Sequence, residues 1–470
     1  MQLIEAVRIT QNTFMAFVGA GGKTTAMFKA ARELSTGQDR NISRKTVFVS
    51  TTTHLGAWQA GIADQAICVN SLPEISKLEK NLPTGVTLLI GEETNNRLSG
   101  LSADILEKVR RIAEERNVPL LVEADGAQSC PLKAPGEHEP AIPEFSKHVV
   151  VVAGLSGIGK QLSREWVHRP EIFAELSGMN LGDEITIEAM VKVLRNNEGG
   201  LKNIPITAHR VLLLNQADTV SLQAQARSIS DQLLNDYPLS IISSLGKPKT
   251  VGTQNTDKTA ESQVEIFAVV ENIAGIILAA GGSSRFGEPK QLLLWKGQPL
   301  IRHVVLTAMK AGLSPIVVVV GSSGQELEKV ILDLPVRIVN NTEWMTGVSS
   351  SIRTGVTAVP KDVGGALFLQ SDQPQVSQML IKKIVESHRV TLAPITAPQI
   401  NGQRGNPVLF DINTFTDLLS LNGDMGGRTL FSHFAVQWVI WHDINQLMDI
   451  DTPADFQKFL EMFMDSEEMT

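Results

Sequence analysis

The residues best suited to chemistry lie in a glycine and serine loop that follows an apolar run at 276–280. Backbone N–H groups in such a loop donate to phosphate oxygens, and glycine lets the backbone come close. Two cations after the loop add charge that a polyphosphate would neutralise. We therefore predict a nucleoside triphosphate site. The expected phosphate contacts are Ala280, Gly281, Gly282, Ser283 and Ser284, and the expected catalytic cations are Arg285 and Lys290.

A second glycine loop follows the apolar run 14–18 and precedes a helical stretch at 26–34. Strand, loop with Lys-Thr and helix is the context of a P-loop, in which Lys23 reaches the terminal phosphates and Thr24 ligates Mg²⁺. Phe17 stands where a full Walker A motif has glycine, so the loop resembles the shorter form of Mur ligases. A purely structural turn is the alternative. The expected nucleotide contacts are Gly19, Gly21, Gly22, Lys23, Thr24 and Thr25.

Carboxylates and a proline-rich loop follow in the first half of the chain. The strand expected at 119–123 leads into Glu123 and Asp125, which resemble a Walker B edge facing the ligand crevice. The loop 131–143 holds four prolines and brings Lys133, His138 and Glu139 close in sequence, a set that could supply a general base or metal ligand. A solvated charged loop is the competing interpretation.

Two further stretches resemble nucleotide motifs. Residues 154–161 have the Gly-x-x-x-x-Gly-Lys spacing, but Gln161 replaces the hydroxyl residue that would ligate Mg²⁺, which favours a structural or substrate-facing turn. Asn215 and Asp218 end another strand with the Asn-x-x-Asp spacing of guanine-reading elements. A helix-capping role for Asp218 explains this second pattern equally well.

In the second half, the apolar run 365–370 ends just before Asp372 and a proline turn. Nucleotidyl transfer needs a metal ligand at such a crevice, because Mg²⁺ neutralises the α-phosphate while pyrophosphate leaves. We predict Asp372 as that ligand, together with Asp449 or Asp451. Gly347 and Ser350 are expected at a base or ribose pocket.

Apolar runs alternate with longer amphipathic stretches, which predicts βαβ units around largely parallel sheets. The expected fold is α/β, with an N-terminal P-loop-like domain at 1–250 and a C-terminal Rossmann-like domain at 268–470. A polar stretch, 251–267, reads as the linker between them.

Composition narrows the function classes. The chain has 470 residues, a net charge of -8 and only two cysteines, Cys68 and Cys130. The absence of a basic field argues against nucleic acid as the main partner. Few cysteines fit a reducing compartment, and no apolar run approaches the ~20 residues of a membrane span. A cytoplasmic protein without a membrane partner is expected.

The first half resembles the YqeC-type family, accessory proteins of selenium-dependent molybdenum hydroxylases. The resemblance rests on Gly-Ala-Gly-Gly-Lys-Thr, Glu-Ala-Asp-Gly and Pro-Leu-Lys-Ala-Pro-Gly-Glu-His-Glu-Pro, which occur here in that order. It implies a role in maturing a molybdenum hydroxylase, whose apoenzyme would be a partner. The glycine loop with Lys23 and Thr24 leads us to expect an ATP- or GTP-dependent step in that role. A plain nucleotide-binding module is the alternative.

The second half resembles the molybdenum cofactor cytidylyltransferases of the MobA-like nucleotidyltransferase group. Four stretches carry this: Leu-Ala-Ala-Gly-x-Ser-x-Arg-x-Gly-x-x-Lys, Ser-Asp-Gln-Pro, Gly-Asn-Pro-Val-Leu-Phe and Gly-Asp-Met-Gly-Gly-Arg. The last two favour cytosine over guanine. The resemblance implies Mg²⁺-dependent transfer of CMP from CTP to molybdopterin, with release of pyrophosphate.

Three other functions stay open from the residues. The same loop serves guanylyltransferases and enzymes that transfer nucleotides to a sugar or alditol phosphate. A non-catalytic carrier, which binds the cofactor only to deliver it, belongs to a different class. Pyrophosphate release distinguishes the enzymes from the carrier.

Overall fold

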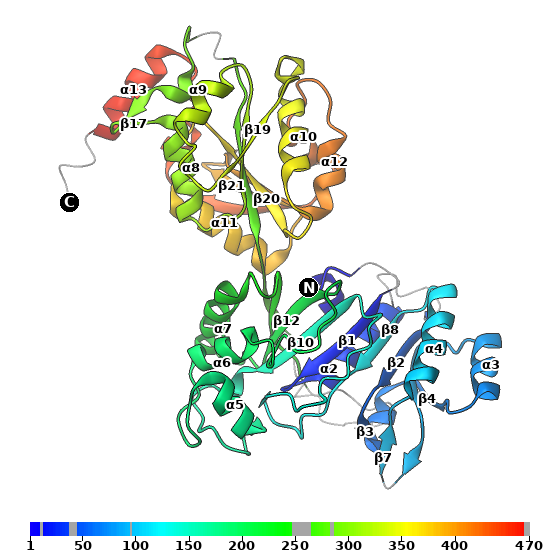
Figure 1. The fold of residues 1–470 in the computed structure, drawn as a ribbon. Helices are drawn as coiled ribbons and strands as arrows, with labels where there is room; N and C mark the ends of the chain where they lie inside the picture. The colour runs from blue at the N-terminus through cyan, green and yellow to red at the C-terminus, as the bar shows by residue number, and fades with distance from the viewer. Residues whose placement is uncertain (10–12, 37–44, 95, 247–264, 283–285, 465–470) are drawn as a thin grey trace. The chain divides into compact units, whose positions relative to one another are not determined.

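The computed structural model describes residues 1–9, 13–36, 45–94, 96–246, 265–282 and 286–464. The chain divides into two compact units, Met1–Val270 and Glu271–Thr470 (Figure 1). The boundary expected at 267/268 differs slightly, because β14 (Glu265–Glu271) joins the sheet of the first unit as its edge strand. Residues 251–264 of the expected linker lie outside the described part.

The first unit is built on a nine-stranded sheet in the order β14-β13-β12-β10-β1-β8-β2-β5-β4. All the pairings given for β1, β2, β4, β5, β8, β10, β12 and β13 are parallel, as the sequence predicts. The strands of this sheet besides β14 are β1 (Phe14–Gly19), β2 (Val47–Thr51), β4 (Gln65–Cys68), β5 (Val86–Ile90), β8 (Leu120–Glu123), β10 (His148–Gly154), β12 (His209–Asn215) and β13 (Leu239–Ser244).

Small sheets and helices surround this sheet. The short strands are β3 (His54–Gly56), β6 (Glu93–Thr94), β7 (Arg97–Ser99), β9 (Leu132–Lys133) and β11 (Val167–His168). The α-helices are α1 (Leu3–Ala6), α2 (Lys23–Thr36), α3 (Leu72–Lys80), α4 (Ala103–Glu115), α5 (Pro170–Ser177), α6 (Ile187–Arg195) and α7 (Val220–Leu233). The 3-10 turns are η1 (Ala57–Ile62) and η2 (Leu155–Gly157). Among the described residues, buried apolar side chains of the sheet and its helices form clusters in the core of this unit.

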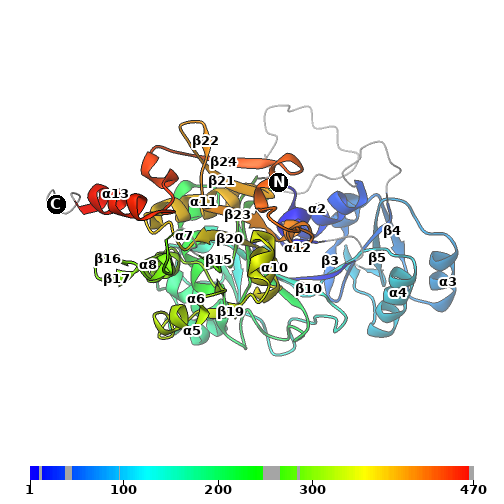
Figure 2. The same ribbon diagram turned by 90° about the horizontal axis from the view of Figure 1, so that it is seen from above.

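The second unit has an eight-stranded mixed sheet in the order β19-β18-β15-β20-β23-β21-β22, with β24 also pairing with β21. Figure 2 shows β22 and β24 beside β21. The strands of this sheet are β15 (Ile273–Ala279), β18 (Ile316–Val320), β19 (Arg337–Asn340), β20 (Gly365–Gln370), β21 (Ile395–Ile400), β22 (Gln403–Arg404), β23 (Val408–Asp411) and β24 (Val436–Trp441). A separate hairpin contains β16 (Leu294–Trp295) and β17 (Gln298–Pro299).

Helices cover both faces of the second sheet. The α-helices are α8 (Leu300–Lys310), α9 (Gly324–Lys329), α10 (Val348–Ala358), α11 (Gln378–Thr391), α12 (Phe415–Leu419) and α13 (Pro453–Met464). The 3-10 turns are η3 (Lys290–Leu292), η4 (Trp344–Thr346), η5 (Ile412–Thr414), η6 (Gly427–Ser432) and η7 (Ile444–Leu447). α8 and α11 lie on one side of the sheet and α10 and α12 on the other (Figure 1). Side chains of each pair of helices pack in a separate apolar cluster against the sheet. β18 is buried along its whole length, as a strand between two helical layers must be.

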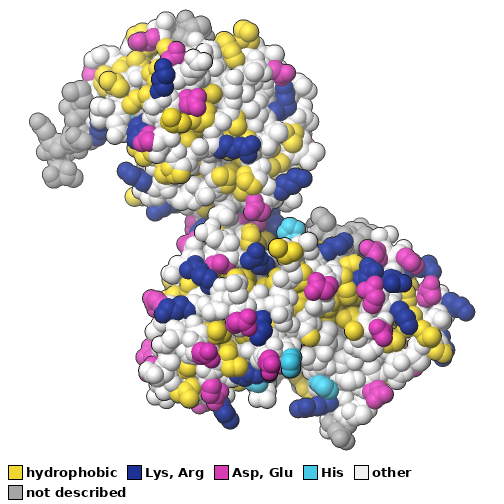
Figure 3. All heavy atoms as spheres, in the orientation of Figure 1, with side chains coloured by type: hydrophobic (Ala, Val, Ile, Leu, Met, Phe, Trp, Pro, Cys, Tyr) yellow, Lys and Arg dark blue, Asp and Glu magenta, His cyan; other side chains and the backbone are white. Residues whose placement is uncertain are grey.

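Two further observations concern partners. Within the described residues, no helix is long and apolar enough to cross a bilayer. On the face of the first unit seen in Figure 3, acidic and basic side chains are interspersed and form no continuous basic area.

Candidate functional site

The centre of the second unit is an ion pair between Lys290 and Asp372. The Lys290 ammonium lies 2.5 Å from an oxygen of Asp372 and 2.9 Å from one of Asp451, and it also donates to the Ile450 carbonyl at 2.9 Å. Lys290 begins η3, and Asp372 follows the carboxyl end of β20, which pairs with β15. Burial opposes the charge of Lys290, but Asp372 and then Asp451 outweigh it and raise its pKa. The lysine is therefore held as a cation at the carboxyl edge of the sheet.

Asp449 lies beside this pair but has a different partner. Its carboxylate accepts a hydrogen bond from the Gln373 amide. Burial raises the pKa of Asp449, the Gln373 bond opposes the shift, and the nearby charges of Asp372 and Asp451 add to it. Hard carboxylate oxygens are the ligands that Mg²⁺ prefers. Among the described residues, however, three potential ligands are nowhere gathered closely enough to hold a metal.

The glycine loop after β15 is only partly described. Gly281 and Gly282 are exposed, Ala280 is buried, and Gln291 donates to the Gly281 carbonyl at 3.4 Å. A Cβ on Gly282 would lie 2.9 Å from the Trp344 ring, so glycine permits this close approach. Ser283, Ser284 and Arg285 lie outside the described residues, and their predicted roles stay predictions.

Gly347 and Ser350 have internal roles that the sequence did not predict. Gly347 has φ +115, and a Cβ there would lie 2.3 Å from the Gly423 carbonyl oxygen. Ser350 is buried, and its hydroxyl donates to the Gly347 carbonyl and accepts from the Asn341 amide. The Ser350 side chain is therefore engaged in hydrogen bonds within the fold, and the predicted roles of Gly347 and Ser350 at a ligand stay predictions.

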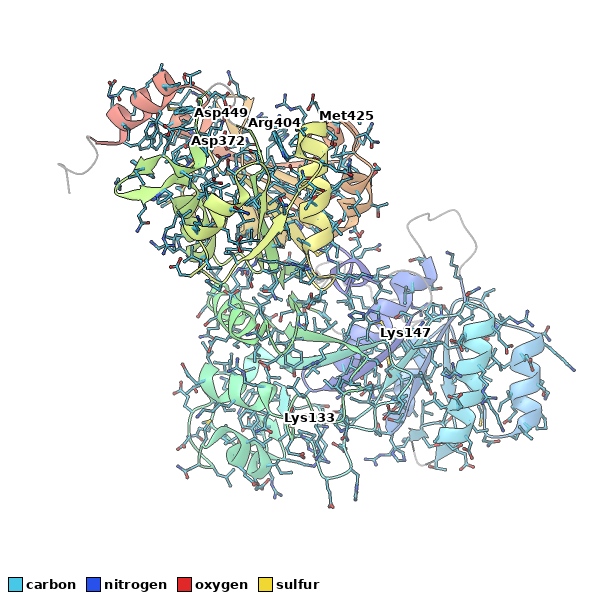
Figure 4. The ribbon with its side chains drawn as sticks, turned by 45° about the horizontal axis from the view of Figure 1, so that its top comes forward. Lys133, Lys147, Asp372, Arg404, Met425 and Asp449 are labelled. Atoms are coloured by element: carbon cyan, nitrogen blue, oxygen red, sulfur yellow. The ribbon has the colours of Figure 1, made fainter. Side chains whose placement is uncertain are left out.

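A cavity of about 410 Å³ opens beside the carboxyl edge of the second sheet. Its lining includes Leu278 from β15, which precedes the glycine loop, and Gln370 from β20, which precedes Asp372. The stretches 401–410 and 423–428, which the sequence singled out, supply much of the rest. Figure 4 shows Asp372, Asp449 and Arg404 at one end of the unit. A volume of this size suits a small organic ligand.

The glycine loop of the first unit has a backbone that side chains would block. Gly19, Gly21 and Gly22 all have positive φ, at 94°, 84° and 129°. A Cβ on Gly19 would lie 2.2 Å from the Val152 carbonyl oxygen, and one on Gly21 would lie 2.5 Å from the Gly154 backbone. The loop thus packs directly on the end of β10. Gly22 and Thr25 are partly exposed, whereas Gly21 is buried.

Lys23, the first residue of α2, turns back onto this loop. Its ammonium donates to the Gly19 carbonyl at 2.7 Å and lies 3.3 Å from Asp125 and 3.8 Å from Glu123. Thr24 donates to Glu123 at 2.7 Å. Burial raises the pKa of Glu123, and the Lys23 charge opposes that shift. The predicted phosphate residues and the predicted carboxylates therefore form one buried cluster at the ends of β1 and β8.

The proline-rich loop joins this cluster through Lys133. Its ammonium donates to Asp125 at 2.8 Å, to Glu139 at 2.8 Å and to the Gly126 carbonyl at 2.7 Å. Burial raises the pKa of Glu139, but hydrogen bonds from Arg169 and Lys133 outweigh it and set the pKa at about 2. Lys133 is buried, so the solvated-loop interpretation is wrong for this lysine. His138 is exposed and has no hydrogen bond or ion pair to the other described residues.

Sequence reasoning missed two members of this region. Arg169 binds both oxygens of Glu139, at 2.7 and 2.9 Å. His168 lies opposite Lys133 in the β9–β11 pair, and burial and the Arg169 charge lower its pKa. A His-Arg-Pro sequence before a helix was the available signal, but its separation from Glu139 along the chain hid the contact.

The two motif-like stretches have structural roles. Residues 154–161 form η2 and a turn with no following helix, and the exposed Lys160 lies 5.0 Å from the Trp166 ring. Asn215 donates to the Gly21 carbonyl at 2.7 Å and accepts from the Leu245 N–H. The N-cap of α7 is Thr219, so capping by Asp218 is not observed.

Comparisons with known proteins match the two units separately. The family model described as YqeC protein matches residues 15–171, and the one described as MobA-like NTP transferase domain matches residues 275–438. Uncharacterized protein YqeC of Escherichia coli (strain K12) is 30% identical over 209 residues, 43% of this chain and 76% of that protein. The first match lies within the first unit, and the second lies within the second.

Two further relatives each resemble part of this chain. Nicotine blue oxidoreductase of Paenarthrobacter nicotinovorans is 27% identical over 198 residues, 40% of this chain and 96% of that protein. Probable molybdenum cofactor guanylyltransferase of Bacillus mycoides (strain KBAB4) is 31% identical over 131 residues, 28% of this chain and 64% of that protein.

Proposed function

The chain belongs to the YqeC family through its first unit and carries a MobA-like NTP transferase domain in its second, and on this basis we propose that it is a molybdenum cofactor cytidylyltransferase. The proposed reaction transfers CMP from CTP to molybdopterin. The observation that carries it is the Lys290–Asp372 pair at the sheet edge, next to a cavity large enough for an acceptor.

The proposed step is an in-line displacement at phosphorus. A terminal phosphate oxygen of molybdopterin forms a bond to the α-phosphorus of CTP, and the bond from that phosphorus to the bridging oxygen breaks. Pyrophosphate leaves with the bond's electron pair. The attacking oxygen is already anionic at neutral pH, so positioning and charge neutralisation replace a general base.

Within this proposal the chain's own residues have distinct parts. Gly281 and Gly282 offer backbone N–H groups to the triphosphate, and Lys290 stabilises the charge of the leaving pyrophosphate. Arg285 shares that part in the prediction. Asp372, with Asp449 or Asp451, would hold Mg²⁺, which supplies positive charge at the α-phosphate. Lys290 must then exchange at least one carboxylate for phosphate oxygens.

Cytosine is proposed because the sequence carries the two stretches, 405–410 and 423–428, by which it resembles cytidylyltransferases. Guanylyl transfer is the second candidate, since a relative of that part bears the name guanylyltransferase. The test is to incubate the full chain with molybdopterin and each NTP, and to identify the dinucleotide and pyrophosphate formed. We expect a CMP product that Asp372→Asn abolishes. A GMP product would establish the second candidate, and tight binding without pyrophosphate would establish a carrier.

For the first unit we propose an ATP- or GTP-dependent accessory step in the maturation of a molybdenum hydroxylase. The glycine loop with Lys23 and Thr24 supports nucleotide binding, and the adjoining carboxylates could ligate Mg²⁺ through oxygen. The proposal that this hydroxylase is selenium-dependent rests on the family resemblance. Pull-down of a hydroxylase apoenzyme by the full chain, with and without ATP or GTP, tests the partnership.

A further inference from the structure

Arg404 presents a cation that the fold leaves without an acceptor. It lies on β22, is partly buried, and stacks on the Phe431 ring with 4.8 Å between the guanidinium carbon and the ring centroid. No hydrogen bond or ion pair to the Arg404 guanidinium is found within the described residues of its unit, 271–282 and 286–464. The contact holds the guanidinium beside the ring, and its N–H groups, which have no acceptor among the described residues, are available to an oxyanion.

A second cation reinforces this charge. Arg428 lines the same cavity and lowers the pKa of Arg404, after the larger effect of burial. Asp424 also lines the cavity, but it forms no ion pair with either arginine in the described parts. Two like charges in one cavity repel each other, and an anionic ligand would relieve that repulsion.

The remaining wall of the cavity suits a flat ring. Phe368, Phe410 and Phe431 line it, with ring centroids of Phe368 and Phe410 5.5 Å apart and those of Phe410 and Phe431 6.5 Å apart. Leu278 and Val408 add aliphatic surface. Aromatic and aliphatic side chains bind the faces of heteroaromatic rings.

We propose that Arg404 and Arg428 are the specificity residues of the acceptor site, and that they select acceptors in which a flat heteroaromatic ring carries an anionic phosphate. This inference rests on the proposed transferase function. A cytosine base is neutral, and the triphosphate is assigned to the loop and Lys290. Two unneutralised arginines therefore fit the acceptor better than the nucleotide.

The test compares two fluorescent probes, neopterin monophosphate and neopterin, by anisotropy titration of the full chain. We expect the phosphorylated probe to bind at least tenfold more tightly. Arg404→Gln should remove most of that preference, Arg404→Lys should restore only part of it, and Arg428→Gln should weaken it by severalfold. Arg302→Gln, on α8 and paired with the exposed Asp333, is the matched control and should change nothing. Thermal unfolding of each variant checks that it is folded.

Equal affinity for the two probes, or unchanged preference in Arg404→Gln, would overturn the proposal. Binding of CTP with Mg²⁺ is measured on the same variants. A folded Arg404→Gln that loses CTP binding but keeps the phosphate preference would assign the cavity to the nucleotide instead. A chain that shows the preference but forms no dinucleotide would refute the transferase function and leave the anion site standing.

Discussion

Lys290 places one positive charge between two carboxylates of the second unit. Its ammonium contacts the carboxylates of Asp372, which follows β20, and of Asp451, which follows η7. These two residues are 79 positions apart in the sequence, so Lys290 connects distant parts of the chain. Its raised pKa keeps it cationic at neutral pH. A preorganised cation of this kind stabilises charge that develops in the transition state without first having to reorient.

Replacing Lys290 should therefore affect the chemical step more than binding. We expect Lys290→Ala to raise the barrier by ~2–4 kcal/mol, or about 30- to 1,000-fold in rate, because one preorganised charge contact is lost. Single-turnover release of pyrophosphate from CTP and molybdopterin measures this. Lys361→Ala, an exposed lysine of the same unit, is the control. A Lys290→Ala protein with an unchanged rate would contradict the assigned role.

The contacts among the candidate site residues could be predicted only in part from the sequence. The sequence indicated Lys290, Asp372 and Asp451 as candidates, but not that one ammonium contacts both carboxylates. In the loop 131–143 the sequence could not say that Lys133 and Glu139 turn inward while His138 is exposed. An irregular loop lacks the period that relates position to side-chain direction in a strand or helix.

At the scale of elements, the loop between β1 and α2 is held by a strand that lies far away in sequence. Asn215, at the end of β12, is buried and bonds to the Gly21 carbonyl. Its carbonyl oxygen accepts from the Leu245 N–H at 2.8 Å and from the Ser243 hydroxyl at 3.3 Å. The amide thus ties three separate segments of the first unit together.

Removing that amide should weaken both the fold and the loop. We expect Asn215→Ala to lower the free energy of unfolding by about 2–4 kcal/mol, because buried partners such as the Leu245 N–H lose their hydrogen bonds. Urea denaturation followed by circular dichroism measures the change. Asn70→Ala, at an exposed site, should cost little. Equal stability of the two variants would show that the hydrogen bonds of Asn215 do not stabilise the first unit.

Strand direction in the second unit was predicted less well than strand position. β15 and β20 lie where the apolar runs 276–280 and 365–370 predicted strands, but β23 runs antiparallel to β20 and β21, and β22 runs antiparallel to β21. Long connections leave direction undetermined in a sequence, because the chain has room to return either way. One signal was available: Asn401 and Gly402, between β21 and β22, both have positive φ, as an Asn-Gly hairpin turn requires.

For the whole molecule, His148 is one group through which acid should destabilise the fold. Burial, followed by the charge of His209, lowers the pKa of His148 from 6.5 to about 4. A depressed histidine pKa favours folding while the ring is neutral, so this stability is complete above pH 6.5 and is lost as pH falls from 6.5 to 4. Glu139, with its pKa at about 2, loses its contribution only below its ordinary pKa of 4.5.

We therefore expect the free energy of unfolding of the full chain to fall between pH 7 and pH 4.5, by no more than about 3 kcal/mol from this histidine, since its ring is partly exposed. Urea titrations at several pH values measure the slope. His148→Gln, which can still bond to Thr13, should flatten it. An unchanged slope in that variant would assign the acid sensitivity to other groups.

The two glycine loops for which we propose phosphate binding belong to units with separate sheets and separate cores. The acids contacted by Lys23 come from β8 and the segment after it, and those contacted by Lys290 come from the second unit alone.

We expect Lys23→Ala to abolish ATP or GTP hydrolysis by the full chain and to leave CMP transfer within about twofold of the parent, because only one charge network loses its cation. Asp372→Asn should give the reverse pattern. Steady-state release of phosphate and of pyrophosphate, assayed separately, measures both, and phosphate release that persists in Lys23→Ala would remove the P-loop assignment. If Lys23→Ala instead stopped CMP transfer, the loops would be coupled, and the accessory step would control delivery of substrate to the second unit.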